Sequence, residues 1–379
     1  MKCKLSDIAV FNPRESIKAG SIAKKVAMEK LQPFCRDIPE YDLAEFNGGT
    51  KFRNGDTIMA RITPCLENGK IAKVGIFEEG EVGFGSTEYI VFRAIPGVSD
   101  EDYLYYLIFS PFVRDLAIKS MVGSSGRQRV QTDVLQNLEL DVPNYETQKR
   151  IGAILGSFDD LIALNSQINN NLAEQIQSIY SNEFDIGTHT PSGVLADICE
   201  YSSDRIPVSE LSVSTYFSTE NMQPNKTGSI DATNLPSIAQ TTRCHKGDIL
   251  VSNIRPYFKK IVYITSNGCG CSTDVLCFVP KEDRYSAYLF GTLYMDRFFD
   301  YMVAGSKGTK MPRGDKQQIM NYPVVLPSKE SLDLFNGIAT PMLYRISSNR
   351  IENTKLIALR DTLLPRLMSG DLDVSTIDF

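Results

Sequence analysis

The 379-residue sequence has no tryptophan and only two histidines, His189 and His245. It has no run of about 18 apolar residues, and its opening Met-Lys-Cys-Lys-Leu-Ser-Asp lacks the apolar segment of a secretion signal. We therefore expect no membrane span, no leader and a cytoplasmic location. Two histidines are too few for a histidine-based catalytic triad or a His-x-Glu-x-x-His zinc site.

Other catalytic patterns are missing as well. The sequence has no Gly-x-x-x-x-Gly-Lys-Ser/Thr phosphate loop, no Pro-Pro pair of the amino-methyltransferase kind, and no carboxylate followed two residues later by lysine. The eight cysteines are dispersed and include no Cys-x-x-Cys pair, so reduced thiols are expected rather than disulfides or a zinc site. We expect no catalytic residue, no metal and no cofactor bound to this chain.

The bulk composition is that of a globular protein, with 42% apolar and 23% charged residues. A chain of 379 residues predicts two to three compact parts rather than one core. The net charge of −6 argues against binding a polyanion over the whole surface, but it leaves a local basic site possible.

A heptad pattern occupies residues 147–180. Apolar or amide side chains recur every seven residues, at Ile151, Phe158, Asn165, Leu172 and Ile179, with Ile154, Leu161 and Ile168 three residues after the first three. This spacing is typical of a helix that packs a narrow stripe against a partner helix. The same seam returns 184 residues later, with Asn349 in the place of Asn165.

The repeat extends beyond the helices. Leu5-Ser-Asp-Ile returns as Leu195-Ala-Asp-Ile, Gly55-Asp56 as Gly247-Asp248, Ser86-Thr-Glu as Ser272-Thr-Asp, and Gly123-Ser-Ser-Gly as Gly305-Ser-Lys-Gly. The order is kept while the offset drifts, as expected when loops change length between two copies of one unit.

Each copy is predicted to be a mixed α/β globular part followed by a long helix. Short β-rich runs lie between Gly, Pro and Asn turn signals, and one amphipathic helix is expected near residues 102–121 and another near 285–303. We place the first globular part at 1–144, the central helix at 145–186, the second globular part at 187–328 and the distal helix at 329–379. Because proline is accepted at a first helical position, the last helix is expected to start at Pro341, after a separate turn at 331–336.

The Gly/Ser loops are the best candidates for a recognition site. They carry hydroxyl, amide, ammonium and guanidinium groups, which bind phosphates and base edges. The candidate residues are Ser124, Ser125, Arg127, Gln128 and Arg129 in the first loop, and Lys307, Thr309, Lys310, Arg313 and Lys316 in the second. One such loop alone is more often a solvated turn, but its occurrence in both copies favours recognition. Arg61, Asn253 and Arg255, near corresponding strand ends, are further candidates for DNA contact or are simply polar turn residues.

The sequence resembles the specificity subunits of type I restriction-modification systems. The resemblance spans the chain and is most specific in residues 359–374, Leu-Arg-Asp-Thr-Leu-Leu-Pro-Arg-Leu-Met-Ser-Gly-Asp-Leu-Asp-Val. Pro143, Glu146, Gln148 and Ile151 are similar to the opening of the family's central helix. The second copy has Ser331-Leu332 in place of Thr147-Gln148, so a contact made by Gln148 is expected to be absent there.

The resemblance implies a non-catalytic protein that selects a bipartite double-stranded DNA target. Two similar target recognition domains would each read one half, separated by two long antiparallel helices that form an intramolecular coiled coil with a pseudo-two-fold repeat. The helices would set the spacer and dock methyltransferase subunits, two in number, which carry S-adenosylmethionine; restriction subunits would use ATP. The rival interpretation, supported by the acidic net charge, is a scaffold that joins two protein-binding domains by a helical rod.

Overall fold

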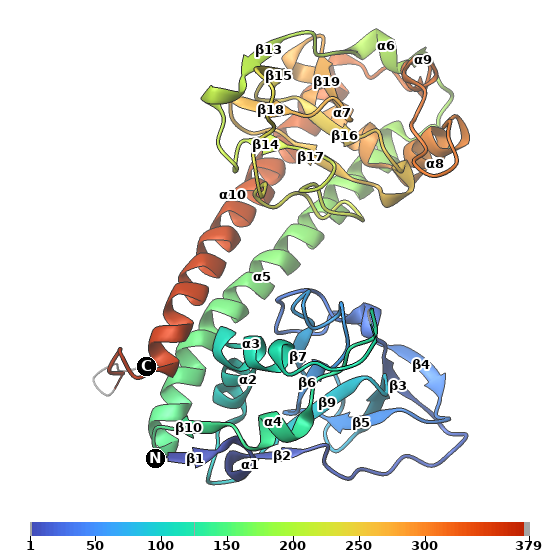
Figure 1. The fold of residues 1–379 in the computed structure, drawn as a ribbon. Helices are drawn as coiled ribbons and strands as arrows, with labels where there is room; N and C mark the ends of the chain where they lie inside the picture. Colours follow the sequence, from blue (N-terminus) through green and yellow to red (C-terminus); the bar gives the residue numbers. More distant parts are fainter. Residues whose placement is uncertain (1, 125, 375–379) are drawn as a thin grey trace. The chain divides into compact units, whose positions relative to one another are not determined.

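The computed structural model describes residues 2–124 and 126–374. The chain divides into two compact units: unit 1 is Met1–Leu164 with Lys355–Phe379, and unit 2 is Asn165–Thr354 (Figure 1). Each unit holds an α/β globular part and a segment of both long helices, α5 (Tyr145–Phe184) and α10 (Lys329–Met368). The predicted fold class, two similar α/β parts with two long helices, is confirmed.

The described part of unit 1 contains two four-stranded sheets and a two-stranded pair. The first sheet has the order β2 (Ala9–Phe11), β9 (Tyr89–Ala94), β6 (Thr57–Ala60), β7 (Ile71–Lys73), all antiparallel. The second has the order β4 (Asp42–Glu45), β3 (Ile22–Val26), β8 (Val82–Gly85), β5 (Thr50–Arg53). The strand pair is β1 (Lys2–Lys4) with β10 (Glu139–Asp141).

The central strands of the first sheet are buried on both faces. Along β6, Ile58 belongs to the core shared with the second sheet, and Met59 to the core shared with the helices. Successive side chains of a strand point to opposite faces, so the first sheet is the middle of three layers. The same alternation along β9, with Val91 and Phe92 in different cores, explains why both strands read as continuous apolar runs.

The helices of unit 1 differ from the sequence prediction in one respect. They are α1 (Leu5–Ile8), α2 (Glu101–Phe109), α3 (Pro111–Lys119) and α4 (Thr132–Gln136), with a 3-10 turn η1 (Met28–Lys30). The single helix expected near 102–121 is therefore wrong. Proline is favoured at a first helical position and costly in a helix interior, and the Ser110 hydroxyl accepts from the Val113 amide, so a new helix starts at Pro111.

Unit 2 repeats this arrangement. Its first sheet has the order β12 (Cys199–Tyr201), β19 (Val275–Pro280), β16 (Ile249–Ser252), β17 (Ile261–Tyr263), and its second the order β13 (Arg205–Pro207), β15 (Gln240–Cys244), β18 (Cys269–Cys271), β14 (Tyr216–Phe217). A short pair joins β11 (Gly193–Val194) to β20 (Pro323–Val324). The helical elements are α6 (Leu195–Ile198), η2 (Val208–Glu210), η3 (Pro256–Phe258), η4 (Asp283–Tyr285), α7 (Ser286–Tyr294), α8 (Asp296–Ala304) and α9 (Lys316–Met320).

The two units agree in register and diverge in composition. Thr57 faces Phe92 across β6 and β9, and Ile249 faces Phe278 across β16 and β19, which are the positions predicted by the sequence repeat. The helix expected near 285–303 is split between α7 and α8, so that prediction is wrong in both copies. The internal repeat predicted from the motifs is confirmed.

The long helix of the second copy runs through Pro341, so the expected start at that residue is wrong. α10 begins at Lys329 and continues without interruption to Met368. A proline ring in a helix interior clashes with the carbonyl four residues earlier, and that residue here is Gly337, the exposed residue with nothing near its Cβ position. The predicted end is confirmed, because Gly370 follows the helix with a φ of +80°.

Two asparagine pairs join α5 to α10 within unit 2. Asn165 Nδ2 donates to Asn353 Oδ1 at 2.9 Å, and Asn349 Nδ2 donates to Asn169 Oδ1 at 2.9 Å. These pairs require the helices to run antiparallel, as predicted. They also follow the pseudo-two-fold repeat, because a shift of 184 residues turns the helix α5 member of one pair into the helix α10 member of the other.

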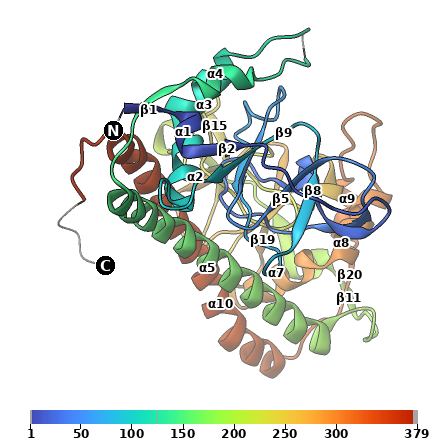
Figure 2. The same cartoon turned by 90° about the horizontal axis from the view of Figure 1, so that it is seen from below.

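The buried stripe of α5 departs from the predicted heptad. Leu161, expected in the seam, is 46% exposed, whereas Leu155, Asp159 and Ile176 are buried. The buried residues Leu155, Asn169 and Ile176 keep multiples of seven between them but lie four residues after Ile151, Asn165 and Leu172, where the prediction placed the second seam position three residues after. Helix α5 packs on α2 of the globular part as well as on α10 (Figure 2). A Cβ on Gly152 would lie 2.8 Å from the Cβ of Asp102 in α2.

The helix pair in unit 1 is joined by a buried ion pair. Asp159 of α5 accepts from Arg360 of α10, and their side chains are 6% and 3% exposed. The Tyr106 hydroxyl donates to the same carboxylate at 2.5 Å. The residues 184 positions away from Asp159 and Arg360 in the repeat are Leu343 and Ile176, both buried in unit 2. At this position of the repeat, one copy has an ion pair between its helices and the other has two buried apolar side chains.

Gln148 explains the start of α5. Its side-chain carbonyl accepts from the Asp100 amide at 3.0 Å, and its amide donates to the carbonyls of Val98 and Pro143. At the corresponding place in the second copy, Leu332 is buried among apolar residues. The expected loss of the glutamine contact in the second copy is confirmed.

Candidate nucleic-acid interface

The first Gly/Ser loop is a short hairpin fixed to the end of strand β6. Val122 and Arg129 exchange backbone hydrogen bonds of 3.0 and 2.9 Å, which closes the loop. The Thr63 amide donates to the Gln128 carbonyl, and the Val130 amide donates to the Arg61 carbonyl. Gly123 has a φ of +138°, and a Cβ there would lie 2.9 Å from the Arg127 carbonyl. A larger residue at position 123 would therefore strain the hairpin.

The second loop is built in the same way. Lys307 and Arg313 exchange backbone hydrogen bonds of 2.9 and 3.0 Å. The Arg255 amide donates to the Pro312 carbonyl, and the Gly314 amide donates to the Asn253 carbonyl. Both loops are therefore held by backbone hydrogen bonds to corresponding strand ends. These ends contain Arg61 in the first copy and Asn253 and Arg255 in the second.

Each loop carries an arginine paired with a carboxylate that lies just before a strand of the first sheet of its unit. Arg129 Nε and Nη2 lie 2.9 and 2.6 Å from the Glu88 carboxylate oxygens. In the second loop, Arg313 Nη2 lies 3.1 Å from Asp274 Oδ1. Glu88 and Asp274 occupy the same place, immediately before β9 and β19. The repeat thus extends to an ion pair.

These carboxylates were not among the residues predicted for the site. Their signal was present in the sequence, because Glu88 and Asp274 end the repeated Ser-Thr-acid motif. That motif marked the duplication without indicating that its acidic residue meets a loop about 40 residues further along. Arg61 adds a second cation in unit 1, with its Nε 3.6 Å from Glu88.

The electrostatics keep the first pair charged. Hydrogen bonds from the Arg129 guanidinium lower the pKa of Glu88 below its ordinary value, and the charges of Arg129 and Arg61 act in the same direction. In the second loop, the Lys307 ammonium lies 2.7 Å from Asp315 and lowers the pKa of that carboxyl. Both loops therefore combine fixed cations with acidic partners.

Most of the predicted site residues lie on these two loops or their supports. Side chains at Ser124, Arg127, Thr309, Lys310 and Lys316 are exposed, those at Arg61, Gln128, Arg129 and Arg255 are partly exposed, and Lys307 and Arg313 are exposed although ion-paired. Ser125 lies outside the described residues.

Asn253 and Lys316 differ from the other candidates. Asn253 is 7% exposed because it extends the buried strand β16, and a Cβ on Gly314 would lie 2.9 Å from its Oδ1. Its side chain supports the loop instead of facing solvent. Lys316 is the first residue of α9, and its ammonium lies 5.7 Å from the centre of the Tyr201 ring.

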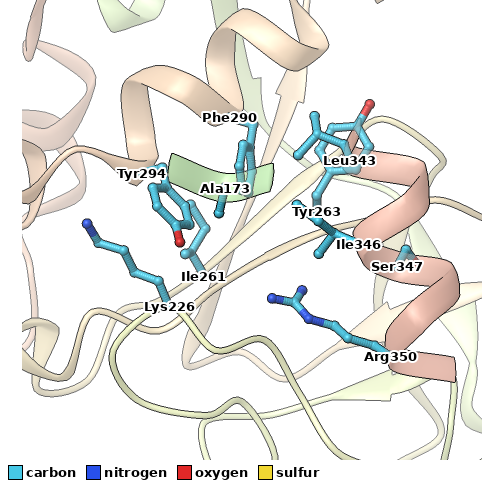
Figure 3. A pocket seen from close by; sticks show the side chains of 10 residues that line it. All are labelled: Ala173, Lys226, Ile261, Tyr263, Phe290, Tyr294, Leu343, Ile346, Ser347 and Arg350. Atoms are coloured by element: carbon cyan, nitrogen blue, oxygen red, sulfur yellow. The ribbon is translucent and has the colours of Figure 1, made fainter. Parts of the chain in front are cut away.

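A small cavity in unit 2 is unsuited to a cofactor. Its volume is about 20 Å³, and it lies among α5, α7, α10 and β17. Figure 3 shows Arg350 reaching from α10 toward the loop of Lys226, with Tyr294 on the opposite side. A volume of this size accommodates about one water molecule.

Residues 2–124 and 126–374 contain neither a metal-binding cluster nor a membrane-spanning helix. In these ranges no group of three or more His, Cys, Asp or Glu side chains could hold a metal ion. The eight cysteines are free thiols. Within the same ranges, every helix is too short or too polar to span a lipid bilayer.

The fold and the paired loops define an internally duplicated α/β protein with two long helices. Residues 4–174 match the sequence model of a family described as "Type I restriction modification DNA specificity domain". This part of the chain is similar to that family, and curated specificity subunits of type I restriction enzymes are similar to the chain over different lengths.

Two curated specificity subunits are similar to this chain over segments of different length. The specificity subunit of the type I restriction enzyme EcoEI from Escherichia coli is 31% identical over 171 residues, which are 43% of this chain and 28% of that protein. The MjaIX specificity subunit from Methanocaldococcus jannaschii is 23% identical over 318 residues, 73% of this chain and 70% of that one. The chain thus spans less than a third of the EcoEI subunit.

A solved structure shares the fold. The type I restriction-modification S subunit from M. genitalium has a TM-score of 0.58 and 14% identity, with 99% of this chain and 96% of that chain covered. The shared fold includes both globular parts and both long helices.

Proposed function

We propose that this chain is the DNA-recognition subunit of a type I restriction-modification complex, with each globular part reading one half of a bipartite double-stranded target. The observation that carries the proposal is the repeated hairpin loop with its arginine and carboxylate. A target with two halves requires two reading sites, and the chain holds two loops of the same construction on different sequences.

The exposed cations of the loops supply the contacts to DNA. Arg127 and Lys310 have exposed side chains near the tips of the two hairpins, where phosphates can approach without displacing an ion-pair partner. Because each phosphate contact releases counterions, binding should weaken steeply as salt rises, with a slope of about −0.9 per contact in log K against log salt. The net charge of −6 argues against DNA binding over the whole surface and favours a local basic site.

The long helices set the spacer and provide the docking surface for methyltransferase subunits, two per chain. Apolar side chains remain exposed on both helices: Leu161 and Leu164 on α5, and Leu334, Ile338, Ile351, Ile357 and Leu359 on α10. Leu161 with Leu164 and Leu334 with Ile338 are three or four residues apart, so each pair shares a helix face, and grouped exposed apolar side chains are typical of protein-binding surfaces. S-adenosylmethionine and ATP would bind the methyltransferase and restriction subunits, and the chain itself would perform no catalysis in the cytoplasm.

The experiment is a binding assay with the full chain and its methyltransferase subunits. Its target is first read from the methylation pattern of cells that express the complex. Duplexes with both halves, one half or neither half are then titrated at several salt concentrations. Tight, salt-sensitive binding that needs both halves supports the proposal, and equal binding to all duplexes, or methyl transfer by the chain alone, contradicts it.

Helix length offers an independent test of the spacer role. Seven residues inserted after Ala163 in α5 and after Lys355 in α10 would lengthen both helices by about 10 Å. These positions lie between the Asp159–Arg360 bridge and the Asn165–Asn353 pair, so both contacts are retained. The preferred gap between half-sites should grow by about three base pairs, and an unchanged gap would refute the spacer role.

A further inference from the structure

The Arg129–Glu88 pair leaves a defined edge of the guanidinium free, and the Arg313–Asp274 pair uses Nη2 alone. Arg129 contacts Glu88 through Nε at 2.9 and 3.1 Å and through Nη2 at 2.6 Å, which is a side-on pairing. Within residues 2–124 and 126–374, Nη1 of Arg129 has no hydrogen-bond partner. The side chain is 42% exposed, whereas Glu88 is 24% exposed. The carboxylate therefore lies behind the guanidinium, and the end formed by Nη1 and Nη2 is available.

The free edge matches one base. Guanine presents two acceptors, N7 and O6, side by side in the major groove, and two parallel N–H donors of arginine fit them. Adenine presents an acceptor beside an N–H donor, and cytosine presents only a donor, so both leave one arginine N–H opposed to another donor.

We propose that Glu88 and Asp274 are positioning residues that hold Arg129 and Arg313 for reading a guanine, one in each half of the target. This inference rests on the proposed function of the chain in DNA recognition. It adds the base that the repeated arginine selects and assigns a role to two carboxylates whose charge alone would repel DNA.

The carboxylate acts by fixing the arginine before DNA arrives. Arginine has many rotamers, and ordering it during binding costs affinity, so a pre-set conformation leaves more of the contact energy for discrimination. A fixed arginine also cannot turn toward a phosphate when the base is wrong. The negative charge weakens binding to every sequence, and the gain is selectivity between sequences.

The second copy supports this role independently. Its loop shares little sequence with the first, yet Arg313 meets Asp274 at the same place in the fold. In both copies the arginine is also the residue that closes the hairpin through its backbone, at Val122 and at Lys307. Arg61, which also faces Glu88, corresponds to the buried Asn253 in unit 2, so the shared part of the arrangement is the one arginine with its carboxylate.

The test uses duplexes in which 7-deazaguanine replaces each guanine of the target in turn. This base lacks N7, so it removes one acceptor and keeps the pairing with cytosine. For the wild-type complex, one position in each half should lower affinity by roughly 5- to 150-fold, the range of a bidentate base contact. Loss of binding to the unmodified target would instead contradict the proposed function as a whole.

The variant Glu88→Gln separates positioning from plain structural support. It should raise affinity for unrelated DNA, because a negative charge is removed, and it should reduce the 7-deazaguanine penalty in one half only. Asp274→Asn should do the same in the other half. The matched control is Glu79→Gln, which removes an exposed carboxylate elsewhere in unit 1 and should leave the penalty unchanged.

Three outcomes overturn the inference. The first is a wild-type complex without a sensitive guanine in either half. The second is a Glu88→Gln complex with the same penalty as Glu79→Gln. The third is a Glu88→Gln complex that loses affinity equally for all sequences and unfolds at a lower temperature, since that pattern belongs to an ion pair that only stabilises the loop.

Discussion

The buried ion pair of unit 1 can be exchanged for the apolar contact that unit 2 uses at the same place. Asp159 and Arg360 are 6% and 3% exposed, and their counterparts in the repeat are Leu343 and Ile176. Taking two charges out of water costs much of what their attraction returns, so a well-packed apolar pair is often as stable or more so. The variants Asp159→Leu and Arg360→Ile, alone and together, test this.

The single variants should differ from each other. Arg360 keeps a second partner, the exposed Asp361, with Nη2 and Oδ1 2.9 Å apart, so Asp159→Leu should destabilise unit 1 by about 3 kcal/mol. Arg360→Ile leaves Asp159 buried with only the Tyr106 hydroxyl as a described hydrogen-bond donor, and its cost should be closer to about 5 kcal/mol.

The double variant should recover most of that loss. The double variant leaves the buried Tyr106 hydroxyl without its hydrogen-bond acceptor, which costs about 1–3 kcal/mol. Adding Tyr106→Phe should therefore bring the stability to the wild-type value or above it. Hydrogen exchange measured by mass spectrometry on peptides from residues 151–164 and 355–368 localises the effect to unit 1. A double variant as unstable as Arg360→Ile would refute the reasoning.

Three further predictions concern the rest of the chain. Asn169→Leu should cost unit 2 about 1–3 kcal/mol in urea unfolding, because Asn349 then keeps two buried polar atoms without a partner, and adding Asn349→Leu should restore most of it. Burial raises the pKa of Asp248 to about 7 in the folded protein. Its contribution to folding stability is therefore fully present below the unfolded pKa of about 4 and is lost as the pH rises to about 7. Asp248→Asn should accordingly stabilise unit 2 relative to wild type by an amount that increases from about pH 4 to pH 7 and is constant above. A pH-independent difference between Asp248→Asn and wild type would contradict this. Arg127→Ala should lower affinity and, if Arg127 contacts a phosphate, reduce the salt slope by about 0.9, whereas unchanged affinity and methylation would remove Arg127 from the interface.

The duplication and the helices could be predicted because they leave periodic signals. Apolar positions recur along α5 and α10, and short motifs recur between the two globular parts. The start of α10 could not be predicted from Pro341 alone. The cost of an interior proline depends on the residue four positions earlier and on tertiary packing, and the apolar residues Phe335 and Ala339 on either side of Gly337 are buried in the core of unit 2.

The candidate site was predicted in part. Glycines, hydroxyls and basic residues within one segment indicated the loops, since these signals are local. The partners of the arginines lie immediately before strands β9 and β19, and a pairing of residues about 40 positions apart has no local signal. The burial of Asn253 is likewise a property of the sheet, because only the depth of β16 distinguishes it from the partly exposed Arg61.

The asparagine pairs also bear on how the two halves recognise each other. Asn165 and Asn169 are the counterparts of Asn349 and Asn353, so a first half alone carries both members of each pair and could self-associate through two identical bonds. Asp159 in such a homodimer would face Ile176 of the other copy, leaving a buried charge without its arginine. The Asp159–Arg360 pair is therefore expected to favour the union of two unlike halves over a symmetric assembly of like ones.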